Sequence, residues 1–256
     1  MRVDVVTLFP EVFPGPLGVG VVGRAIERGT LEVQAHDLRQ HGLGAHRQVD
    51  DEPFGGGPGM VLRPEPLFAA VRALRALAGL PPGHAILLGA HGRRFDADGA
   101  RRLAGEARLI LICGRYQGVD ERVVEGLALD ELSIGDFVLS GGELAAMVVV
   151  EAVARQLAGT LGAPESLQQE SFTRGTVEHP HYTRPAVFEG WPVPEVLRGG
   201  DHAAIARWRH RAAAARARRL RPDLLDPPAP APAMPGADLI SPHEPSALVA
   251  ASGGAP

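Results

Sequence analysis

The sequence predicts an α/β protein built on a mainly parallel sheet, and three observations support this fold class. Strand-like and helix-like segments alternate from the first residues to about residue 157. Two short, nearly continuous apolar runs, 84–90 and 108–114, each end in small residues, which is typical of parallel strands buried on both faces. After residue 160 the periodic apolar pattern stops, which indicates that the sheet domain ends there.

Each element of this prediction follows from the spacing of apolar residues. Apolar residues at helical spacing mark helices, and short apolar runs bounded by glycine mark strands. The expected strands are 2–9, 31–38, 84–90 and 108–114, and the expected helices are 21–29, 66–79, 96–106, 142–157 and 201–220. The expected core contacts of the 66–79 helix are Leu67, Val71, Leu74 and Leu77, and those of the 142–157 helix are Leu144, Met147, Val148 and Leu157.

Composition excludes several classes of protein. The single cysteine, Cys113, excludes an intrachain disulfide and a cysteine-rich zinc site, and its apolar neighbours favour a buried structural thiol. All 26 basic residues are arginine, so a phosphate-binding P-loop, which needs lysine, is excluded. Neither a signal peptide nor a membrane span is supported, so we expect a cytoplasmic protein without membrane contact.

Changes in residue composition along the chain divide it into four expected parts. Residues 1–159 form the α/β domain, 160–178 a polar linker, 179–225 a small basic helical domain, and 226–256 a disordered tail rich in proline and alanine. Between Arg198 and Arg221 there are eight arginines and one acidic residue, Asp201, although the whole chain carries a formal net charge of -4. A solvated helix face is the simple interpretation, but eight arginines with almost no acidic residues among them are better explained by a polyanionic partner.

Glycine-rich segments follow three of the predicted strands. They are 87–92, 113–118 and 133–142, and the last encloses a short strand-like run, Phe137 to Leu139. Each segment alone is typical of a turn, but in an open α/β sheet ligands bind at the carboxyl ends of the strands, so together they favour one pocket. A fourth segment, 54–60, permits either close backbone approach to a flat ligand or simple flexibility. The histidines at 36, 41, 46, 179 and 181 lack a metal-ligand pattern, so no metal site is expected.

Four segments carry a resemblance to a known family. They read "ICGRYQGVDERV" (112–123), "SIGDFVLSGGE" (133–143), "GGGPGM" (55–60) and "HYTRPAVFEGWPVPEVLRGGDHAAIARWR" (181–209). Together they resemble the bacterial tRNA (guanine-N1)-methyltransferases of the SPOUT superfamily. The similarity extends from Met1 to about Leu225, in order and with consistent spacing, which is far more specific than any one glycine motif.

The resemblance implies a SPOUT-type trefoil-knotted parallel sheet with a small, mainly helical C-terminal domain, in a homodimer whose active site lies between the subunits. It implies S-adenosylmethionine as cofactor and methylation of N1 of guanosine 37 in tRNA. By motif position, the implied cofactor-binding residues are Leu87, Leu88, Gly89, Gly114, Arg115, Tyr116, Gln117, Ser133, Ile134, Gly135, Asp136, Phe137, Val138, Leu139, Gly141 and Gly142. The implied tRNA-binding residues are Gly57, Pro58, Gly59, Ser171, Tyr182, Arg184, Arg207 and Arg209.

The expected chemistry assigns two catalytic residues. Guanine N1 carries a proton, so the enzyme must remove that proton and stabilise the charge that spreads onto O6. The resemblance implies Arg155 as the O6 stabiliser and Glu170 as the base, at a position where the family has aspartate. Gln117 stands where the family has glutamate, and weaker cofactor binding is the expected direction. The sequence leaves open a requirement for Mg2+.

Two alternative functions remain on the sequence alone. One is a catalytically weakened paralogue that binds tRNA, which the changes at Gln117 and Glu170 favour. The other is a SPOUT methyltransferase that acts on another RNA base.

Overall fold

The computed structural model describes residues 1–161, 170–173 and 175–225. The chain divides into two compact units after Thr173. The expected tail at 226–256 and part of the expected linker at 160–178 lie outside the described residues. In the part of the chain that the structure describes, no helix combines the length and the apolar character needed to cross a membrane.

The first unit contains a five-stranded sheet in the order β2-β1-β6-β5-β7, and all its strand pairs are parallel. The prediction of an α/β fold with a parallel sheet is therefore confirmed. The strands of this sheet are β1 (Arg2–Thr7), β2 (Glu32–Asp37), β5 (His84–Arg94), β6 (Arg108–Cys113) and β7 (Asp130–Ser133). Its helices are α1 (Pro14–Leu17), α2 (Gly20–Glu27), α3 (Pro64–Arg75), α4 (Ala97–Ala104), α5 (Glu121–Leu127) and α6 (Glu143–Ala154). A two-stranded ribbon adds β3 (Asp50–Asp51) and β4 (Val61–Leu62).

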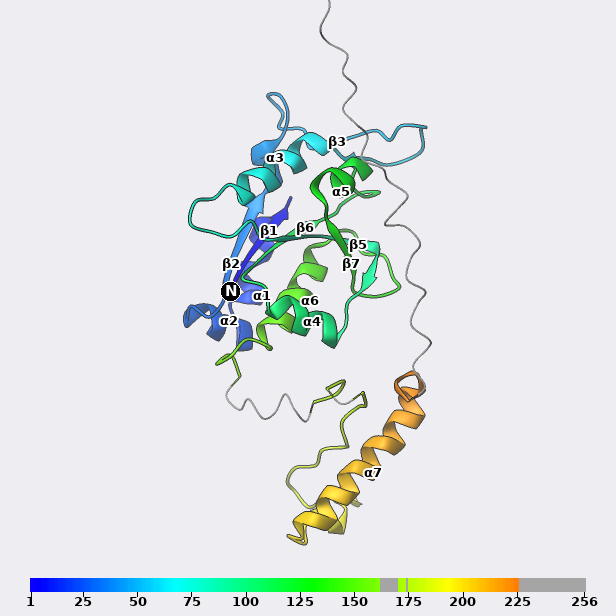
Figure 1. The fold of residues 1–256 in the computed structure, drawn as a ribbon. Helices are drawn as coiled ribbons and strands as arrows, with labels where there is room; N and C mark the ends of the chain where they lie inside the picture. The colour runs from blue at the N-terminus through cyan, green and yellow to red at the C-terminus, as the bar shows by residue number, and fades with distance from the viewer. Residues whose placement is uncertain (162–169, 174, 226–256) are drawn as a thin grey trace, which may run out of the picture. The chain divides into compact units, whose positions relative to one another are not determined.

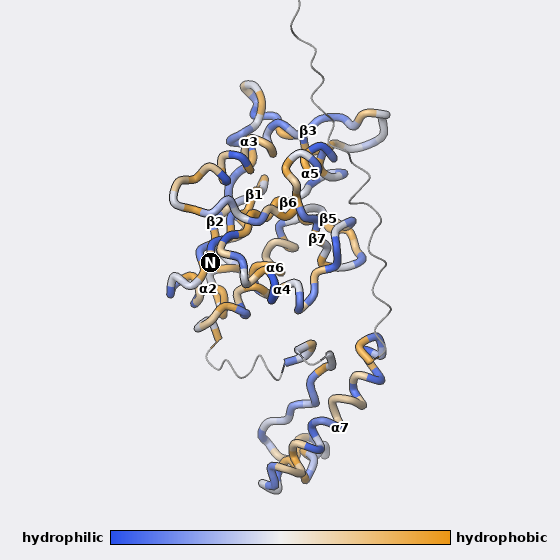
Figure 2. Tube along the Cα trace, viewed as in Figure 1, coloured by the Kyte–Doolittle hydropathy of each residue, from blue (hydrophilic) through white to orange (hydrophobic). Residues whose placement is uncertain are grey.

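Helices cover both faces of the sheet (Figure 1). Successive side chains of a strand point to opposite faces, and the two hydrophobic clusters follow this alternation. In β6, Leu109 and Leu111 pack on the side of α4 and α6, whereas Ile110 and Ile112 pack on the side of α3 and α5. Figure 2 shows β6 and α6 as largely hydrophobic segments inside this arrangement. The layers fix which residues reach the carboxyl ends of the strands.

The glycine-rich segment 87–92 interrupts the pairing of β5 with β7 instead of ending the strand. Leu88 and Arg93 both pair with Leu132, so the residues between them leave the ladder as a bulge. β5 is therefore longer than the predicted strand 84–90. Gly92 is needed for this path because an added Cβ would meet the Leu132 backbone. Because of the bulge, residues 89–91 leave the sheet and lie beside the loops that follow β6 and β7.

Several details of the sequence prediction are wrong. Leu77 is 40% exposed because α3 ends at Arg75, before that position. Leu144 and Val148 of α6 are exposed, since the core-facing side of this helix is made of alanines and valines instead. The run from Phe137 to Leu139 is an exposed loop, not a strand. Cys113, Leu67, Val71 and Leu74 are buried as predicted.

The second unit is dominated by one helix. Its elements are the hairpin strands β8 (Val187–Phe188) and β9 (Trp191–Pro192) and the helix α7 (His202–Leu220). The Asp201 side chain caps α7 by accepting a hydrogen bond from Ala204 N at 3.0 Å, which satisfies one free amide of the first turn. The prediction of a helix at 201–220 is confirmed. Trp208 packs its ring against Tyr182 and His179.

Candidate active site

Three glycine-rich loops meet around one pocket of about 520 Å³, which we call the glycine pocket. The loops follow β6 and β7 and include the bulge of β5, so the pocket lies at the carboxyl ends of neighbouring strands. Fourteen of the sixteen predicted cofactor-binding residues line it: Leu88, Gly89, Gly114, Arg115, Tyr116, Gln117, Ser133, Ile134, Gly135, Phe137, Val138, Leu139, Gly141 and Gly142. Residues distant in sequence are thus brought into one cavity.

Two predicted cofactor residues do not line the glycine pocket. Leu87 points to the opposite face of the sheet, where it belongs to the cluster around α3 and α5. Asp136 is exposed at the turn of the last loop. Motif position alone missed six lining residues, namely Ala90, His91, Gly118, Leu132, Ser140 and Ala145. The alternation of side chains along β5, which places Leu88 and Leu87 on opposite faces, was the available signal for excluding Leu87.

Backbone contacts hold the loops of the glycine pocket together. Gly142 N donates to Gly114 O at 2.9 Å, and Arg115 and Gly141 form an antiparallel bridge. A Cβ at Gly142 would lie 2.7 Å from Cys113 Cα and 3.1 Å from Gly114 N, both in the backbone. The close approach of the two loops therefore requires glycine at this position.

A buried carboxylate stands behind the glycine pocket. Glu143, at the start of α6, is 6% exposed and accepts a hydrogen bond from Thr7 Oγ1 at 2.9 Å. Its other oxygen lies 3.4 Å from Arg115 Nη2, and the Arg115 guanidinium lies 4.4 Å from the centre of the Phe9 ring. Arg115 is therefore held between a carboxylate and an aromatic face. The positive end of the α6 dipole also favours a carboxylate here.

Tyr116 is the second side chain of the pocket with a distinct environment. Its backbone has a φ of 60°, in the left-handed region that few residues other than glycine adopt. Burial and the neighbouring Asp50 carboxylate, to which the hydroxyl donates a hydrogen bond, raise the pKa of that hydroxyl, so the group is neutral at physiological pH.

The glycine loop 54–60 lies beside the glycine pocket, and Gln117 connects the two. Gln117 N donates to Met60 O at 3.0 Å, and its side-chain Nε2 donates to Pro58 O. This loop holds three predicted tRNA-binding residues, Gly57, Pro58 and Gly59. Each of the three therefore lies in a loop that borders the predicted cofactor site.

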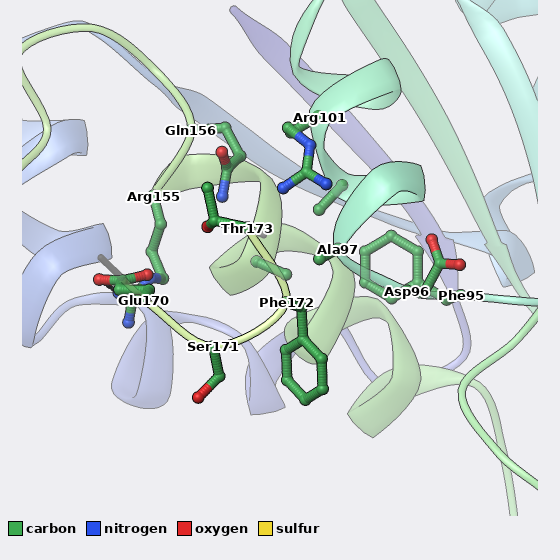
Figure 3. Close-up of a pocket in the computed structure, with 12 residues that line it drawn as sticks. Phe95, Asp96, Ala97, Arg101, Arg155, Gln156, Glu170, Ser171, Phe172 and Thr173 are labelled. Carbon is green, nitrogen blue, oxygen red and sulfur yellow. Dashed lines mark hydrogen bonds and ion pairs between the residues drawn. The ribbon is translucent and has the colours of Figure 1, made fainter. Parts of the chain in front are cut away.

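Arg155 and Glu170, the predicted catalytic residues, meet in a second pocket of about 290 Å³, which we call the ion-pair pocket. Arg155 Nη2 donates to Glu170 Oε1 at 2.5 Å. Figure 3 shows this pair on one side of the pocket and Phe95 with Asp96 on the other. Ser171, a predicted tRNA residue, also lines it. Both side chains of the pair are about one third exposed, so an incoming ligand can reach them.

The two pockets lie at opposite ends of α6. Ala145 lines the glycine pocket, whereas Ala152 and Arg155 line the ion-pair pocket. Since an α-helix rises 1.5 Å per residue, the segment from Ala145 to Arg155 spans roughly 15 Å. Within one chain the two pockets are therefore separate cavities, although both belong to the first unit.

The predicted tRNA residues of the second unit are only partly brought together. Tyr182, Arg184 and Arg209 line one pocket of about 370 Å³, together with Arg198, which the motifs had not singled out. Arg207 does not line this pocket. Charge counting could have indicated Arg198, since it belongs to the arginine-rich stretch.

Among the described residues, no group of three histidine, cysteine, aspartate or glutamate side chains is arranged to hold a metal ion. His36 contacts Asp4 at 2.8 Å, and His181 contacts Glu178 at 3.0 Å. Burial raises the pKa of the Cys113 thiol well above its ordinary value, so this residue is kept protonated beneath the pocket.

The fold and these pockets define an α/β protein with a pocket lined by glycine-rich loops and a separate carboxylate–guanidinium pocket. The family described as "tRNA (Guanine-1)-methyltransferase TrmD" matches residues 1–227, and the chain belongs to that family. Three relatives are each named "tRNA (guanine-N(1)-)-methyltransferase". The one from Geobacter sulfurreducens is 51% identical over 88% of this chain and 91% of its own. The one from Moorella thermoacetica is 53% identical over 88% and 90%. The one from Gluconobacter oxydans is 50% identical over 88% and 95%.

Proposed function

We propose that this protein transfers a methyl group from S-adenosylmethionine to N1 of guanosine 37 in tRNA. Family membership and the names of the relatives support the reaction class. The observation that carries the proposal is the convergence of three glycine loops on one pocket, with a carboxylate–guanidinium pair in a second pocket. A tRNA substrate also supports the expectation of a cytoplasmic enzyme.

The residues of the glycine pocket fit S-adenosylmethionine. A volume of about 520 Å³ lies within the range of small-molecule sites. Gly142 lets the loops after β6 and β7 pack against each other, and the glycine-rich lining of the pocket leaves backbone N–H and C=O groups open to an adenosine. When bound, the cofactor supplies a methyl group already activated by a sulfonium sulfur. The pocket residues listed above would hold it, and Tyr116 would offer a neutral hydroxyl.

The ion-pair pocket fits the edge of guanine. N1–H is a donor and the adjacent O6 is an acceptor, whereas a carboxylate only accepts and a guanidinium only donates. Glu170 would accept the N1 proton, and Arg155 would donate to O6 as negative charge spreads onto it. Because the two side chains already contact each other, their spacing matches two adjacent atoms of one base edge. Deprotonation makes N1 a nucleophile.

The separation of the pockets supports a homodimer with the active site between subunits. Methyl transfer requires reacting atoms about 3–3.5 Å apart, far less than the span of α6 between the pockets. Leu144 and Val148 are 60% and 46% exposed one helical turn apart, and Val138 of the glycine pocket is 87% exposed. If the α6 helices of two copies pack antiparallel through this apolar face, the glycine pocket of one subunit meets the ion-pair pocket of its partner.

The trefoil knot and the domain roles are part of the same proposal. The backbone bond from Gly142 to Gly114 and the bridge from Arg115 to Gly141 support a knotted path through the two loops. Residues 1–159 would then be the knotted cofactor-binding domain, 160–178 the segment that carries the base, and 179–225 the tRNA-binding domain. The arginine-rich α7 supports the last assignment, because phosphate contacts need unpaired cations.

A labelling assay tests the proposal. Labelled S-adenosylmethionine is incubated with tRNA transcripts that carry guanosine or adenosine at position 37, and the modified base is located by primer extension, which N1 methylation blocks. We expect label only in the guanosine transcript, with a stop at position 37. Equal labelling of both transcripts would contradict the target base, and tRNA binding without labelling would favour the non-catalytic alternative. Repeating the assay with EDTA tests the need for Mg2+.

A further inference from the structure

Gln117 is the residue at which the glycine pocket and the glycine loop 54–60 meet. It lines the pocket, and its side-chain Nε2 donates to Pro58 O. Its backbone N donates to Met60 O at 3.0 Å. Immediately beside it, Leu62 N donates to Gly118 O at 3.0 Å, and Leu62 and Val119 form a parallel bridge, so short parallel pairing joins the end of the loop to the pocket wall.

The glycine loop has little else to define its conformation. The glycines at 55, 56, 57 and 59 all have positive φ angles, so the backbone is free to adopt many conformations. Gly56 N donates to Pro53 O, just before the loop, at 3.2 Å. Phe54 is fully exposed. The bond to Pro58 is therefore the side-chain contact that fixes the tip of the loop.

The absence of a side chain at Gly59 makes room for this contact. A Cβ at Gly59 would lie 2.8 Å from Gln117 Nε2 and 2.9 Å from its Cδ, so glycine leaves the space that the amide occupies. The amide is also the right chemical group, because Pro58 offers only a carbonyl acceptor and an amide nitrogen can donate to it. A carboxylate has no N–H and would place an oxygen against the carbonyl oxygen.

We propose that Gln117 is a positioning residue that couples the cofactor pocket to the substrate loop, by holding Pro58 so that loop 54–60 keeps one conformation. The identification of that loop as part of the tRNA site rests on the proposed function. This role differs from the expectation drawn from the resemblance, which was that Gln117, in place of glutamate, weakens cofactor binding. Here a glutamate at 117 releases the loop, so Gln117→Glu impairs the use of tRNA.

The test compares three variants of the full chain. Gln117→Glu and Gln117→Met both remove the donor, and Gln34→Glu makes the same chemical change at an exposed site on β2. Hydrogen exchange is measured at the amides of Leu62 and Gln117 in the absence of cofactor and tRNA. We expect exchange roughly tenfold faster in both Gln117 variants, as the loss of one hydrogen bond implies, and unchanged in Gln34→Glu. Unchanged exchange within β6 shows that each variant is folded.

Kinetics then separate positioning from cofactor contact. We expect the KM for tRNA to rise roughly tenfold in both Gln117 variants, a larger factor than the change in the Kd for S-adenosylmethionine, whose pocket Gln117 also lines. Wild-type exchange in both variants would overturn the proposal, and so would weaker cofactor binding with an unchanged KM for tRNA. A wild-type protein that methylates no tRNA would refute the proposed function, and the exchange measurement would still decide the role of Gln117.

Discussion

The glycine pocket and the ion-pair pocket are built in different ways. In the glycine pocket, backbone groups make the contacts that hold the loops, and Gly142 leaves no space for a side chain. In the ion-pair pocket, two flexible side chains from separate segments make the central contact, and both are partly exposed. One site is defined by the path of the chain and the other by two side-chain conformations.

This difference predicts different consequences for binding and for rate. A site made of fixed backbone groups needs little reorganisation when its ligand binds, so changes there should alter affinity. In the ion-pair pocket, Glu170 and Arg155 contact each other and must rearrange to admit guanine. Changes there should therefore alter the chemical step. The variants below separate these two roles.

The largest effect is expected at the ion-pair pocket. Glu170→Gln removes the proton acceptor but keeps the shape, and we expect kcat to fall by roughly 10²–10⁴-fold, the usual contribution of general base catalysis. The Kd for S-adenosylmethionine, measured by calorimetry, should not change, because Glu170 does not line the glycine pocket. Arg155→Ala should likewise lower kcat and leave the Kd for S-adenosylmethionine unchanged. A Glu170→Gln enzyme with normal kcat would show that another group takes the proton.

The next effect is expected at the glycine pocket. Gly142→Ala places a Cβ against Cys113 Cα at 2.7 Å, and backbone atoms cannot move aside without a change in the loops. Such overpacking costs about 1–3 kcal/mol, so we expect the Kd for S-adenosylmethionine to rise roughly tenfold to hundredfold. Gly89→Ala is the matched control for the fold, because its nearest neighbour would be His91 Nδ1 at 3.9 Å. Equal thermal destabilisation of both variants would contradict this account.

Cys113 reports on the same distortion. It is 2% exposed, and burial raises the pKa of its thiol well above its ordinary value, so little thiolate forms at pH 8 in the folded protein. Iodoacetamide should therefore alkylate the wild type slowly. In Gly142→Ala the rate should rise, because the residue that covers Cys113 Cα is displaced. An unchanged rate would show that the loops absorb the added methyl group.

The sequence predicted those features of the two pockets that depend on the local pattern of residues. Apolar runs at 84–90 and 108–114 marked two buried strands, and the glycines after them marked the loops of the pocket. β7 was not predicted because Asp130–Ser133 is short and has no apolar run, and α5 was not predicted because it is a seven-residue helix that contains Gly126. The pairing of these strands in space, which decides that Leu88 lines the pocket and Leu87 does not, depends on the whole sheet.

The error at α6 has a similar physical cause. Leu144 and Val148 satisfy the spacing of a core face as well as the buried Ala145, Val149 and Val153 do, because α6 is apolar on most sides. A helix that is hydrophobic all round has no single face that the sequence can assign to the core. The structure shows which side faces the sheet and leaves the larger side chains exposed, and these form the surface that we assign to the partner subunit.

A smaller effect on cofactor affinity is expected at Glu143, the buried carboxylate next to the glycine pocket. Glu143→Gln keeps an acceptor for Thr7 Oγ1 but removes the charge that faces Arg115 Nη2 at 3.4 Å. Because Arg115 is partly exposed, solvent screens this ion pair, and we expect only a three- to tenfold rise in the Kd for S-adenosylmethionine. kcat at saturating cofactor should stay normal. A fall in kcat without a change in Kd would place Glu143 in the chemical step instead.

The smallest effect tests whether the two pockets act across subunits. When Gly142→Ala and Arg155→Ala proteins are unfolded together and refolded as a mixture, half of the dimers should contain one copy of each. The assay uses a cofactor concentration that saturates the wild type but lies well below the Kd of Gly142→Ala. Each mixed dimer has one active site with an intact glycine pocket and an intact ion-pair pocket, so activity should recover to about a quarter of the wild-type value. Arg155→Ala mixed with Glu170→Ala is the control. Those residues pair within one chain, so both changes damage the same pocket of their own subunit, and each mixed dimer has a damaged ion-pair pocket at both sites. No recovery in the first mixture would place both pockets of each active site within a single chain, and recovery in the control would show that Arg155 and Glu170 of one active site come from different chains.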